Sequence, residues 1–394
     1  MRVLHLSTSM SGGAGVAAQR IVSSQVKIGL QSQLLCRNSN LQGISGRLNV
    51  VLGKVNTVAS RVISEEKYDF ISPFSKSNIE LEIIKEFKPD LVNVHNWYNY
   101  LSLKDLQKLG EQFPLVFTMH DARLVTGGCH VTLGCKNFEN SCSHCPASKI
   151  DSVVKLSKNR QDLVFSKINK YALVFPSRWL RRELANSEIF GQARFSEVIN
   201  NPLEIKYVIP SVEKKDKQIE MCFISATLES NFKGLFMLKE ALLIFSKQHP
   251  GIQILVNLVG SSKQDFDANF GNIVIRKLGS LSSDSVGALL KRADYLLVPS
   301  QSDNFPNVIS EAQTLGTLVV ATNVGGIPEM IVDGVSGFLS ENTALDFAGT
   351  MKRAIDSKDS SNIRAQAKID AQSRCSEENA GLEYKRIYEK LLAS

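Results

Sequence analysis

Two carboxylates, Asp303 and Glu311, bracket the predicted start of a helix and could bind a ligand there. The apolar run 295–298 predicts a buried strand, and Pro306 and Gly316 suit the first turn and the end of the following helix. Free backbone N–H groups and the positive end of the helix dipole form a seat for a phosphate, and nearby carboxylates can accept hydrogen bonds from sugar hydroxyls. The segment therefore indicates a sugar-nucleotide site, with a merely capped helix as the alternative.

The same segment resembles a family signature. Two acids eight positions apart enclose Phe-Pro-Asn-Val, and Glu-Ala, a glycine, the strand Val-Val-Ala-Thr and Gly-Gly-Ile-Pro-Glu follow. This series is similar to the donor site of glycosyltransferase family 4, in which the first acid is usually Glu and not Asp303. The resemblance implies a retaining enzyme that transfers a hexosyl-type sugar from a UDP- or GDP-sugar to a hydroxyl. It also implies the GT-B fold, with two Rossmann-like doubly wound parallel-sheet domains facing across a cleft.

The resemblance further assigns roles in the donor site. Glu311 would bind the nucleotide ribose, and Asp303 would lie near the transferred sugar. Lys233, which ends a loop before Gly234, would bind the diphosphate and offset charge on the leaving nucleotide; a surface lysine is the alternative. Thr227 stands where many relatives have an arginine. The remaining donor-binding residues that the resemblance predicts are Gly260, Asn304, Phe305, Pro306, Asn307 and Val308.

A glycine-rich loop follows the first predicted strand. Gly13 and Gly15 allow a backbone to approach a ligand closely, so the loop could contact donor phosphate or acceptor. A tight strand-to-helix turn is the alternative. The spacing fits a dinucleotide fingerprint, but Arg37 stands near the end of the second strand where NAD binding needs an acid.

His120 and Asp121 end another predicted strand of the first domain. The family usually has a histidine near the reacting centre at this place, so the resemblance makes His120 the candidate catalytic residue, with Asp121 orienting it. A strand-end histidine satisfied by backbone is the alternative. His95 ends a neighbouring strand, and we expect it to serve acceptor binding or packing.

Four of the seven cysteines lie close together in the sequence. Cys129, Cys135, Cys142 and Cys145 fit a structural zinc site, since a cytoplasmic chain rarely keeps disulfides and Cys-x2-Cys is half of many such sites. Free thiols or disulfides are the alternative, and four thiolates would leave no open position for a catalytic metal. A subset of family 4 has a similar cluster after His-Asp. The isolated cysteines are predicted to be buried fillers: Cys36, Cys222 and Cys375.

Alternating strand-like and helix-like segments organise the whole chain. They predict an N-terminal acceptor-side domain over 1–200 that contains a cysteine-rich loop over 126–148. A nucleotide-sugar-binding domain over 201–376 follows. An amphipathic helix over 377–394 ends the chain, and the resemblance implies that it returns to the N-terminal domain.

The composition limits the classes of function. The 394 residues are 43% hydrophobic and 22% charged with a net charge of +7, typical of a globular protein and too modest for a nucleic-acid binder. No signal peptide or membrane span is apparent, so we expect a cytoplasmic location with peripheral contact to the inner face of the plasma membrane as an option. Expected partners are a nucleotide-sugar donor and a glycan or lipid-linked acceptor of bacterial surface polysaccharide synthesis, without a catalytic metal. A GT-B nucleotide-sugar epimerase and a non-catalytic, zinc-stabilised binding protein are the alternatives.

Overall fold

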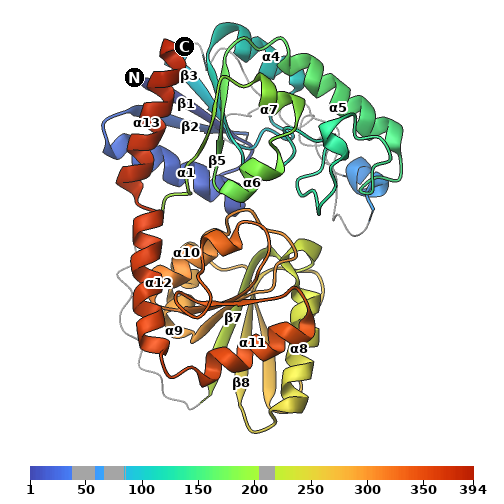
Figure 1. Cartoon of the computed structure of the whole chain (residues 1–394), viewed down its shortest axis with the longest axis vertical. Coiled ribbons are helices and arrows are strands. Elements are labelled where there is room, and N and C mark those ends of the chain that lie inside the picture. Colours follow the sequence, from blue (N-terminus) through green and yellow to red (C-terminus); the bar gives the residue numbers. More distant parts are fainter. Residues whose placement is uncertain (38–57, 66–83, 85, 204–217) are drawn as a thin grey trace. The chain divides into compact units, whose positions relative to one another are not determined.

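The computed structural model describes residues 1–37, 58–65, 84, 86–203 and 218–394. The chain divides into two compact units (Figure 1). The first unit comprises Met1–Pro202 together with Glu377–Ser394, and the second comprises Leu203–Ser376. The returning C-terminal segment is therefore part of the first unit.

The first unit is built on a parallel sheet of six strands in the order β2-β1-β3-β4-β5-β6. The strands β1, β3, β4 and β5 are buried along almost their whole length, as expected where helices cover both faces of a parallel sheet. The strand bounds are β1 Arg2–Ser7, β2 Gln31–Cys36, β3 Leu91–Val94, β4 Leu115–Thr118, β5 Tyr171–Phe175 and β6 Ser196–Val198.

Helices connect these strands. The helix α4 begins with a capping box, in which Ser102 and Asp105 each bond the other's backbone N–H. The described helices of this unit are α1 Gly12–Lys27, α4 Leu103–Gln112, η2 Asn137–Glu139, α5 Asp151–Phe165, α6 Arg178–Glu183, α7 Glu188–Gln192 and α13 Glu377–Ala393.

The C-terminal helix α13 packs along α1 (Figure 1). A Cβ added at Gly381 would lie 2.6 Å from the carbonyl oxygen of Ser24, so the glycine permits this close helix contact. Tyr384 and Tyr388 of α13 are almost fully buried in the core beneath the sheet. The predicted return of the last helix to the N-terminal domain is confirmed.

The second unit contains a sheet of seven strands in the order β13-β12-β11-β7-β8-β10-β9. All neighbours are parallel except β9, which pairs antiparallel with β10. The strands are β7 Ile219–Thr227, β8 Ile254–Ser261, β9 Ala268–Asn269, β10 Ile273–Gly279, β11 Tyr295–Val298, β12 Leu318–Thr322 and β13 Phe338–Ser340. The helices are η3 Asn231–Lys233, α8 Leu235–Gln248, α9 Ser283–Arg292, α10 Asn307–Leu315, η4 Ile327–Glu329, α11 Ala344–Asp356 and α12 Ser360–Arg374.

Each sheet has one place where the strand order reverses. In the first unit the chain runs from β1 to β2 on one side and then returns to β3 on the other side. In the second unit it runs from β7 through β8 to β10 and then returns to β11 on the opposite side of β7. Open α/β sheets bind ligands beyond the carboxyl ends of the strands at such switch points. We therefore expect ligand sites at the ends of β1 and β3 and at the ends of β7 and β11.

Two apolar clusters fill the second unit, one on each face of its sheet. Alternate residues of the strands contribute to each: Met221 and Leu297 belong to one cluster, and Cys222 and Leu296 to the other. The carboxyl ends of the strands are therefore held on a rigid support. No helix in the described part of the chain is long and apolar enough to span a bilayer.

Candidate functional site

The switch point of the second unit brings together two residues predicted for the donor site. Lys233 ends the loop after β7, and Asp303 lies in the loop after the adjacent strand β11. The Lys233 Nζ donates to the Asp303 Oδ2 over 2.6 Å, and the two side chains are 38% and 12% exposed. The sequence predicted both residues in one site but not this ion pair. The Lys233 side chain remains partly exposed, so it can also contact an anion.

Backbone contacts fix the loop that carries Lys233 against the end of β11. Gly234 adopts a φ of +74°, and a Cβ added there would lie 1.8 Å from the Pro299 carbonyl oxygen. The Gln301 N–H also donates to the Phe232 carbonyl over 2.8 Å. Only glycine fits at position 234, because the conformation is left-handed and the two backbones touch. The lysine is thus held by rigid backbone and not by a free loop.

The loop after β12 supports Asp303 from the other side. The Gly326 N–H donates to the Asp303 carbonyl over 2.9 Å. Gly325 has a φ of +62°, and a Cβ added there would lie 2.0 Å from the same carbonyl oxygen. The Gly-Gly pair, which the sequence placed in the family signature, therefore positions the acidic loop.

The helix α10 begins directly after that loop. Pro306 is its N-cap and makes no side-chain cap, and the first turn contains no acidic residue, so its backbone N–H groups suit an anion. Glu311 lies one turn further along and is partly buried. Gly316 ends the helix with a φ of +82°, as predicted.

The other residues predicted around α10 divide into two groups. Phe305 is 5% exposed and packs in the apolar core, so its side chain anchors the loop and only its backbone can serve a ligand. Pro306 is also buried. Asn304, Asn307 and Val308 are partly exposed.

The glycine predicted to admit the nucleotide, Gly260, has a structural role. It is the last residue but one of β8 and has a φ of +154°, and a Cβ added there would lie 2.4 Å from the Ser225 carbonyl oxygen of β7. The glycine is explained by the contact between β7 and β8. Thr227, which stands in place of the family's usual arginine, is exposed at the end of β7 and has its hydroxyl 3.5 Å from that of Ser261.

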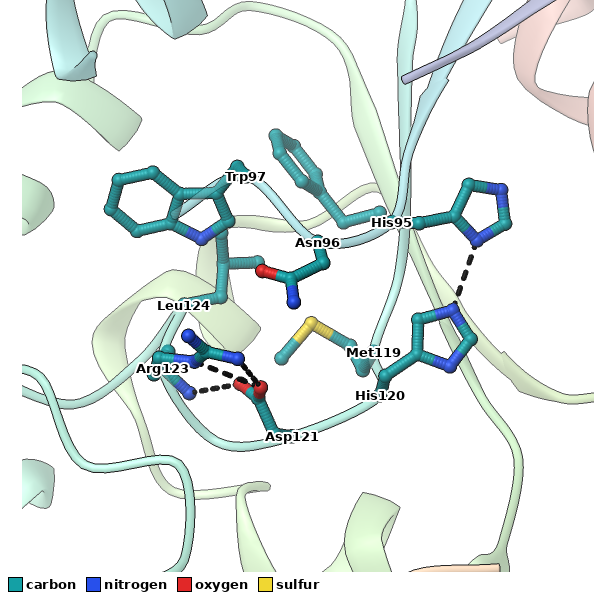
Figure 2. A pocket seen from close by; sticks show the side chains of 9 residues that line it. His95, Asn96, Trp97, Met119, His120, Asp121, Arg123 and Leu124 are labelled. Carbon is teal, nitrogen blue, oxygen red and sulfur yellow. Dashed lines mark hydrogen bonds and ion pairs between the residues drawn. The ribbon is translucent and has the colours of Figure 1, made fainter. Parts of the chain in front are cut away.

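The first unit has its own pocket beyond the ends of β3 and β4. Figure 2 shows His95 and His120 side by side at its edge, with Asp121 and Arg123 opposite them. The His95 Nδ1 lies 3.0 Å from the His120 Nε2. The pocket is lined by His95, Asn96, Trp97, Phe117, Met119, His120, Asp121, Arg123 and Leu124.

The Asp121 carboxylate, which was predicted to orient His120, contacts Arg123. It accepts from the Arg123 Nε over 2.9 Å, from the Arg123 guanidinium over 2.5 Å and from the Arg123 backbone N–H over 2.9 Å (Figure 2). Burial alone would raise the pKa of the Asp121 carboxyl, but the Arg123 guanidinium keeps that pKa below its usual value. The His95 ring stacks on His120 and lies within hydrogen-bond distance of it, whereas the Asp121 carboxylate faces Arg123.

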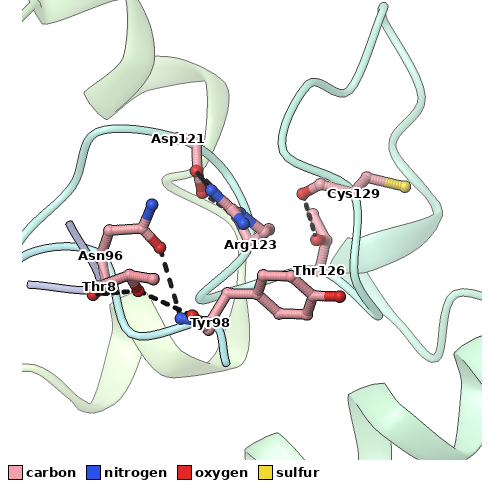
Figure 3. Close-up of polar contacts among 7 residues, drawn as sticks. All are labelled: Thr8, Asn96, Tyr98, Asp121, Arg123, Thr126 and Cys129. Atoms are coloured by element: carbon pink, nitrogen blue, oxygen red, sulfur yellow. Dashed lines mark hydrogen bonds and ion pairs between the residues drawn. The ribbon is translucent and has the colours of Figure 1, made fainter. Parts of the chain in front are cut away.

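Arg123 was not identified from the sequence. Its guanidinium also lies over the Tyr98 ring, 5.4 Å from the centroid, and Figure 3 shows it between Asp121 and Tyr98. The Thr8 hydroxyl donates to the Asn96 and Tyr98 carbonyls over 2.9 and 2.7 Å, which ties the end of β1 to this loop. The only signal in the sequence was a basic residue two positions after Asp121.

The glycine-rich loop lies beside the switch point at the end of β1. A Cβ added at Gly15 would lie 2.5 Å from the Ser9 carbonyl oxygen, so this glycine lets the loop fold onto the start of α1. A Cβ at Gly13 would meet no described atom within 4 Å. Among the described residues no packing contact requires a glycine at position 13, and this glycine suits close approach of a ligand.

The four clustered cysteines line one small cavity. The Cys129 thiol and the Cys145 sulfur form a hydrogen bond, which is the largest influence on both groups: it raises the pKa of Cys129 well above the usual value and lowers that of Cys145 to about 7. Burial raises the pKa of the Cys142 thiol to about 11. Cys142 also accepts the Gly127 N–H over 3.3 Å.

The backbone of this loop is held in unusual conformations. Leu133, Cys142 and His144 have φ values of +47°, +54° and +55°, although none is glycine. The donor set fits zinc, and no cysteine of the described residues is in a disulfide. Within that part of the chain, however, no three or more His, Cys, Asp or Glu side chains converge as metal ligands. The sulfur atoms would have to move towards a common point to bind an ion.

Comparison with known proteins finds a family match in the second unit. Residues 218–357, which lie in the second unit, match the family model described as glycosyl transferases group 1. An uncharacterized glycosyltransferase of Methanocaldococcus jannaschii is 26% identical over 41% of this chain and 47% of its own length. The chain thus spans less than half the length of that relative. A protein of Escherichia coli K12 named as a colanic acid biosynthesis glycosyl transferase is 24% identical over 68% of both chains.

Solved structures show the fold of the whole chain. The HepE protein of Anabaena, solved in complex with UDP-glucose, has a TM-score of 0.63 and 17% identity, covering 99% of this chain and 100% of the other. The class defined here is the GT-B fold, as predicted, with a match to glycosyl transferases group 1 in its second unit.

Proposed function

We propose that the chain is a retaining glycosyltransferase of family 4 that moves a hexosyl-type sugar from a UDP- or GDP-sugar to a hydroxyl acceptor. The observation that carries the proposal is the Lys233–Asp303 pair at the switch point between β7 and β11. It stands beside the start of α10, where Pro306 provides no side-chain cap and backbone N–H groups can hold phosphate oxygens. The match to glycosyl transferases group 1 over this unit supports the proposal.

Different residues of the second unit bind different parts of the donor. The Lys233 ammonium exchanges part of its contact with Asp303 for the diphosphate and stabilises the charge that develops on the departing nucleotide. Glu311 accepts from the nucleotide ribose, and Asp303 accepts from the transferred sugar. The lysine and the α10 amides neutralise the diphosphate, so the chemistry that we propose does not rely on a metal ion.

The first unit serves the acceptor. His120 at the pocket beyond β4 contacts the reacting sugar or the acceptor hydroxyl, and Gly13 lets a ligand approach the α1 start. The name of the Escherichia coli relative supports an acceptor in surface polysaccharide or lipid-linked oligosaccharide synthesis. Arg178, Arg181 and Arg182 of α6 are exposed and fit peripheral contact with anionic headgroups at the cytoplasmic face of the plasma membrane.

An assay with the full chain tests this function. The protein is incubated with UDP- and GDP-sugars, with and without lipid-linked acceptors, and products are separated by mass. We expect a glycosylated acceptor whose anomeric configuration, read by NMR, matches that of the donor. Isomerised free donor would indicate an epimerase, and neither product with any donor would contradict the proposal.

We also propose that Cys129, Cys135, Cys142 and Cys145 bind one structural zinc ion. The shared cavity and the left-handed Cys142 backbone support it. We expect about one zinc per purified chain and a lower melting temperature after chelation. The Cys145→Ser variant should lose the metal, whereas Cys36→Ser, outside the cluster, should keep it. A metal-free wild-type protein, or equal zinc in both variants, would overturn the assignment.

A further inference from the structure

Three histidines form a hydrogen-bonded column inside the first unit. The His5 Nδ1 lies 2.9 Å from the His95 Nε2, and the His95 Nδ1 lies 3.0 Å from the His120 Nε2. The rings stack with centroids 5.2 and 5.3 Å apart, and Figure 2 shows the outer pair at the pocket. His5 is completely buried in β1, where a histidine within a buried parallel strand was the signal that sequence reasoning did not use.

The column ends in an amide. The Gln25 Oε1 lies 2.9 Å from the His5 Nε2 and also accepts from the Ser32 hydroxyl over 2.7 Å. The Gln25 Nε2 donates to the Tyr388 hydroxyl over 2.8 Å. The Asn93 amide donates to the same hydroxyl over 2.8 Å. In this arrangement the amide oxygen of Gln25 faces His5.

This orientation determines which nitrogen of each ring carries the proton. An amide oxygen can only accept, so the His5 Nε2 must carry a proton. A neutral imidazole has one N–H, and the His5 Nδ1 must therefore accept from the His95 Nε2. By the same rule the His95 Nδ1 accepts from the His120 Nε2, so the proton of His120 is on its Nε2. The His120 Nδ1 is then an acceptor.

The surroundings keep the column neutral. Burial lowers the pKa of His5 to about 4 and of His120 to about 4, and it also lowers that of His95, which the other two rings lower further. Asp121 opposes the shift at His120, but its charge is paired with Arg123. Because the inner end is an amide, which does not take up protons, the column orders tautomers and does not conduct protons.

We propose that Gln25, His5 and His95 are positioning residues that lock His120 as the neutral Nε2–H tautomer, so that His120 meets its ligand as a hydrogen-bond acceptor at Nδ1. An acceptor nitrogen needs a hydrogen-bond donor from its ligand, and a hydroxyl of a sugar is such a donor. The ligand assignment rests on the proposed function, whereas the tautomer does not. Tyr388 couples the lock to the C-terminal helix α13.

The tautomer can be read directly by NMR on the full chain labelled with ¹⁵N-histidine, because protonated and unprotonated ring nitrogens have well separated shifts. Comparison with His120→Asn assigns the ring. We expect one neutral tautomer with the proton on Nε2 from about pH 6 to 8, the range around an ordinary histidine pKa. A proton on Nδ1, a charged ring or a mixed population in the wild type would overturn the lock.

Two Gln25 variants distinguish control of the His120 tautomer by the Gln25 oxygen from a role of Gln25 in packing alone. Gln25→Glu keeps an acceptor for His5 and should preserve the His120 tautomer. Gln25→Met has similar size but no acceptor, and it should give a mixture. His5→Phe, which keeps the ring stack without its nitrogens, gives the same expectation if Gln25→Met does not fold. An unchanged tautomer in a folded Gln25→Met or His5→Phe protein would sink the proposal. Absence of transferase activity would overturn the proposed function and leave this result intact.

Discussion

Replacing Lys233 by alanine is expected to lower the rate of sugar transfer by roughly two to three orders of magnitude, the usual loss when one group that stabilises developing charge is removed. The ammonium is the cation that the structure places on Asp303 at the switch point of the second unit. Its removal leaves both the diphosphate and the partly buried carboxylate without their counter-charge. Initial rates under saturating donor measure the effect.

Lys352 offers a matched control for that variant. It also forms an ion pair, with Asp356 in α11 of the same unit, but it lies outside the candidate site. Lys352→Ala should transfer sugar at close to the wild-type rate, because an exposed pair of this kind contributes only about 0–1 kcal/mol to stability. Equal rates for the two variants would contradict the role of Lys233.

The Gly325→Ala variant is expected to lose about a hundredfold in transfer, since a shift of about 1 Å in a positioning element can have that effect. The new methyl group would lie 2.0 Å from the Asp303 carbonyl oxygen and must displace the acidic loop. The residue itself carries no reactive group. Kinetics would therefore report the placement of Asp303.

The control variant Gly334→Ala separates the effect of moving the acidic loop from the effect of backbone strain. Gly334 has a φ of +73°, close to that of Gly325, but a Cβ added there meets no described atom within 4 Å. Both variants therefore bear the left-handed strain of about 1–2 kcal/mol, and only Gly325→Ala moves the loop. If both variants retained the same rate, the positioning role of the Gly-Gly turn would be wrong.

The fold was predictable because its signals are local. Buried apolar runs such as 295–298 and the run that ends at His120 indicated parallel strands, and the α10 end at Gly316 followed from its glycine. The fold class and the return of the last helix are confirmed. These features depend on periodicity and backbone conformation, which a single sequence contains.

The contacts between distant side chains could not be obtained in this way. The Lys233–Asp303 pair joins residues seventy positions apart, and the column of Gln25, His5, His95 and His120 joins α1, β1 and the ends of β3 and β4. Asp121 was predicted to orient His120, but its carboxylate contacts Arg123. Such pairings depend on the register of the sheet, which fixes strand ends side by side.

Thermal unfolding of the wild-type protein and of Lys233→Ala, with UDP-sugars, GDP-sugars and the corresponding monophosphates, tests the central claim most directly. Ligand bound to the native state raises the melting temperature, by an amount that follows its affinity. We predict that one nucleoside diphosphate sugar raises the melting temperature of the wild type, that its monophosphate raises it less, and that Lys233→Ala loses the shift. No shift with any nucleoside diphosphate sugar, or the same shift in Lys233→Ala, would contradict the account.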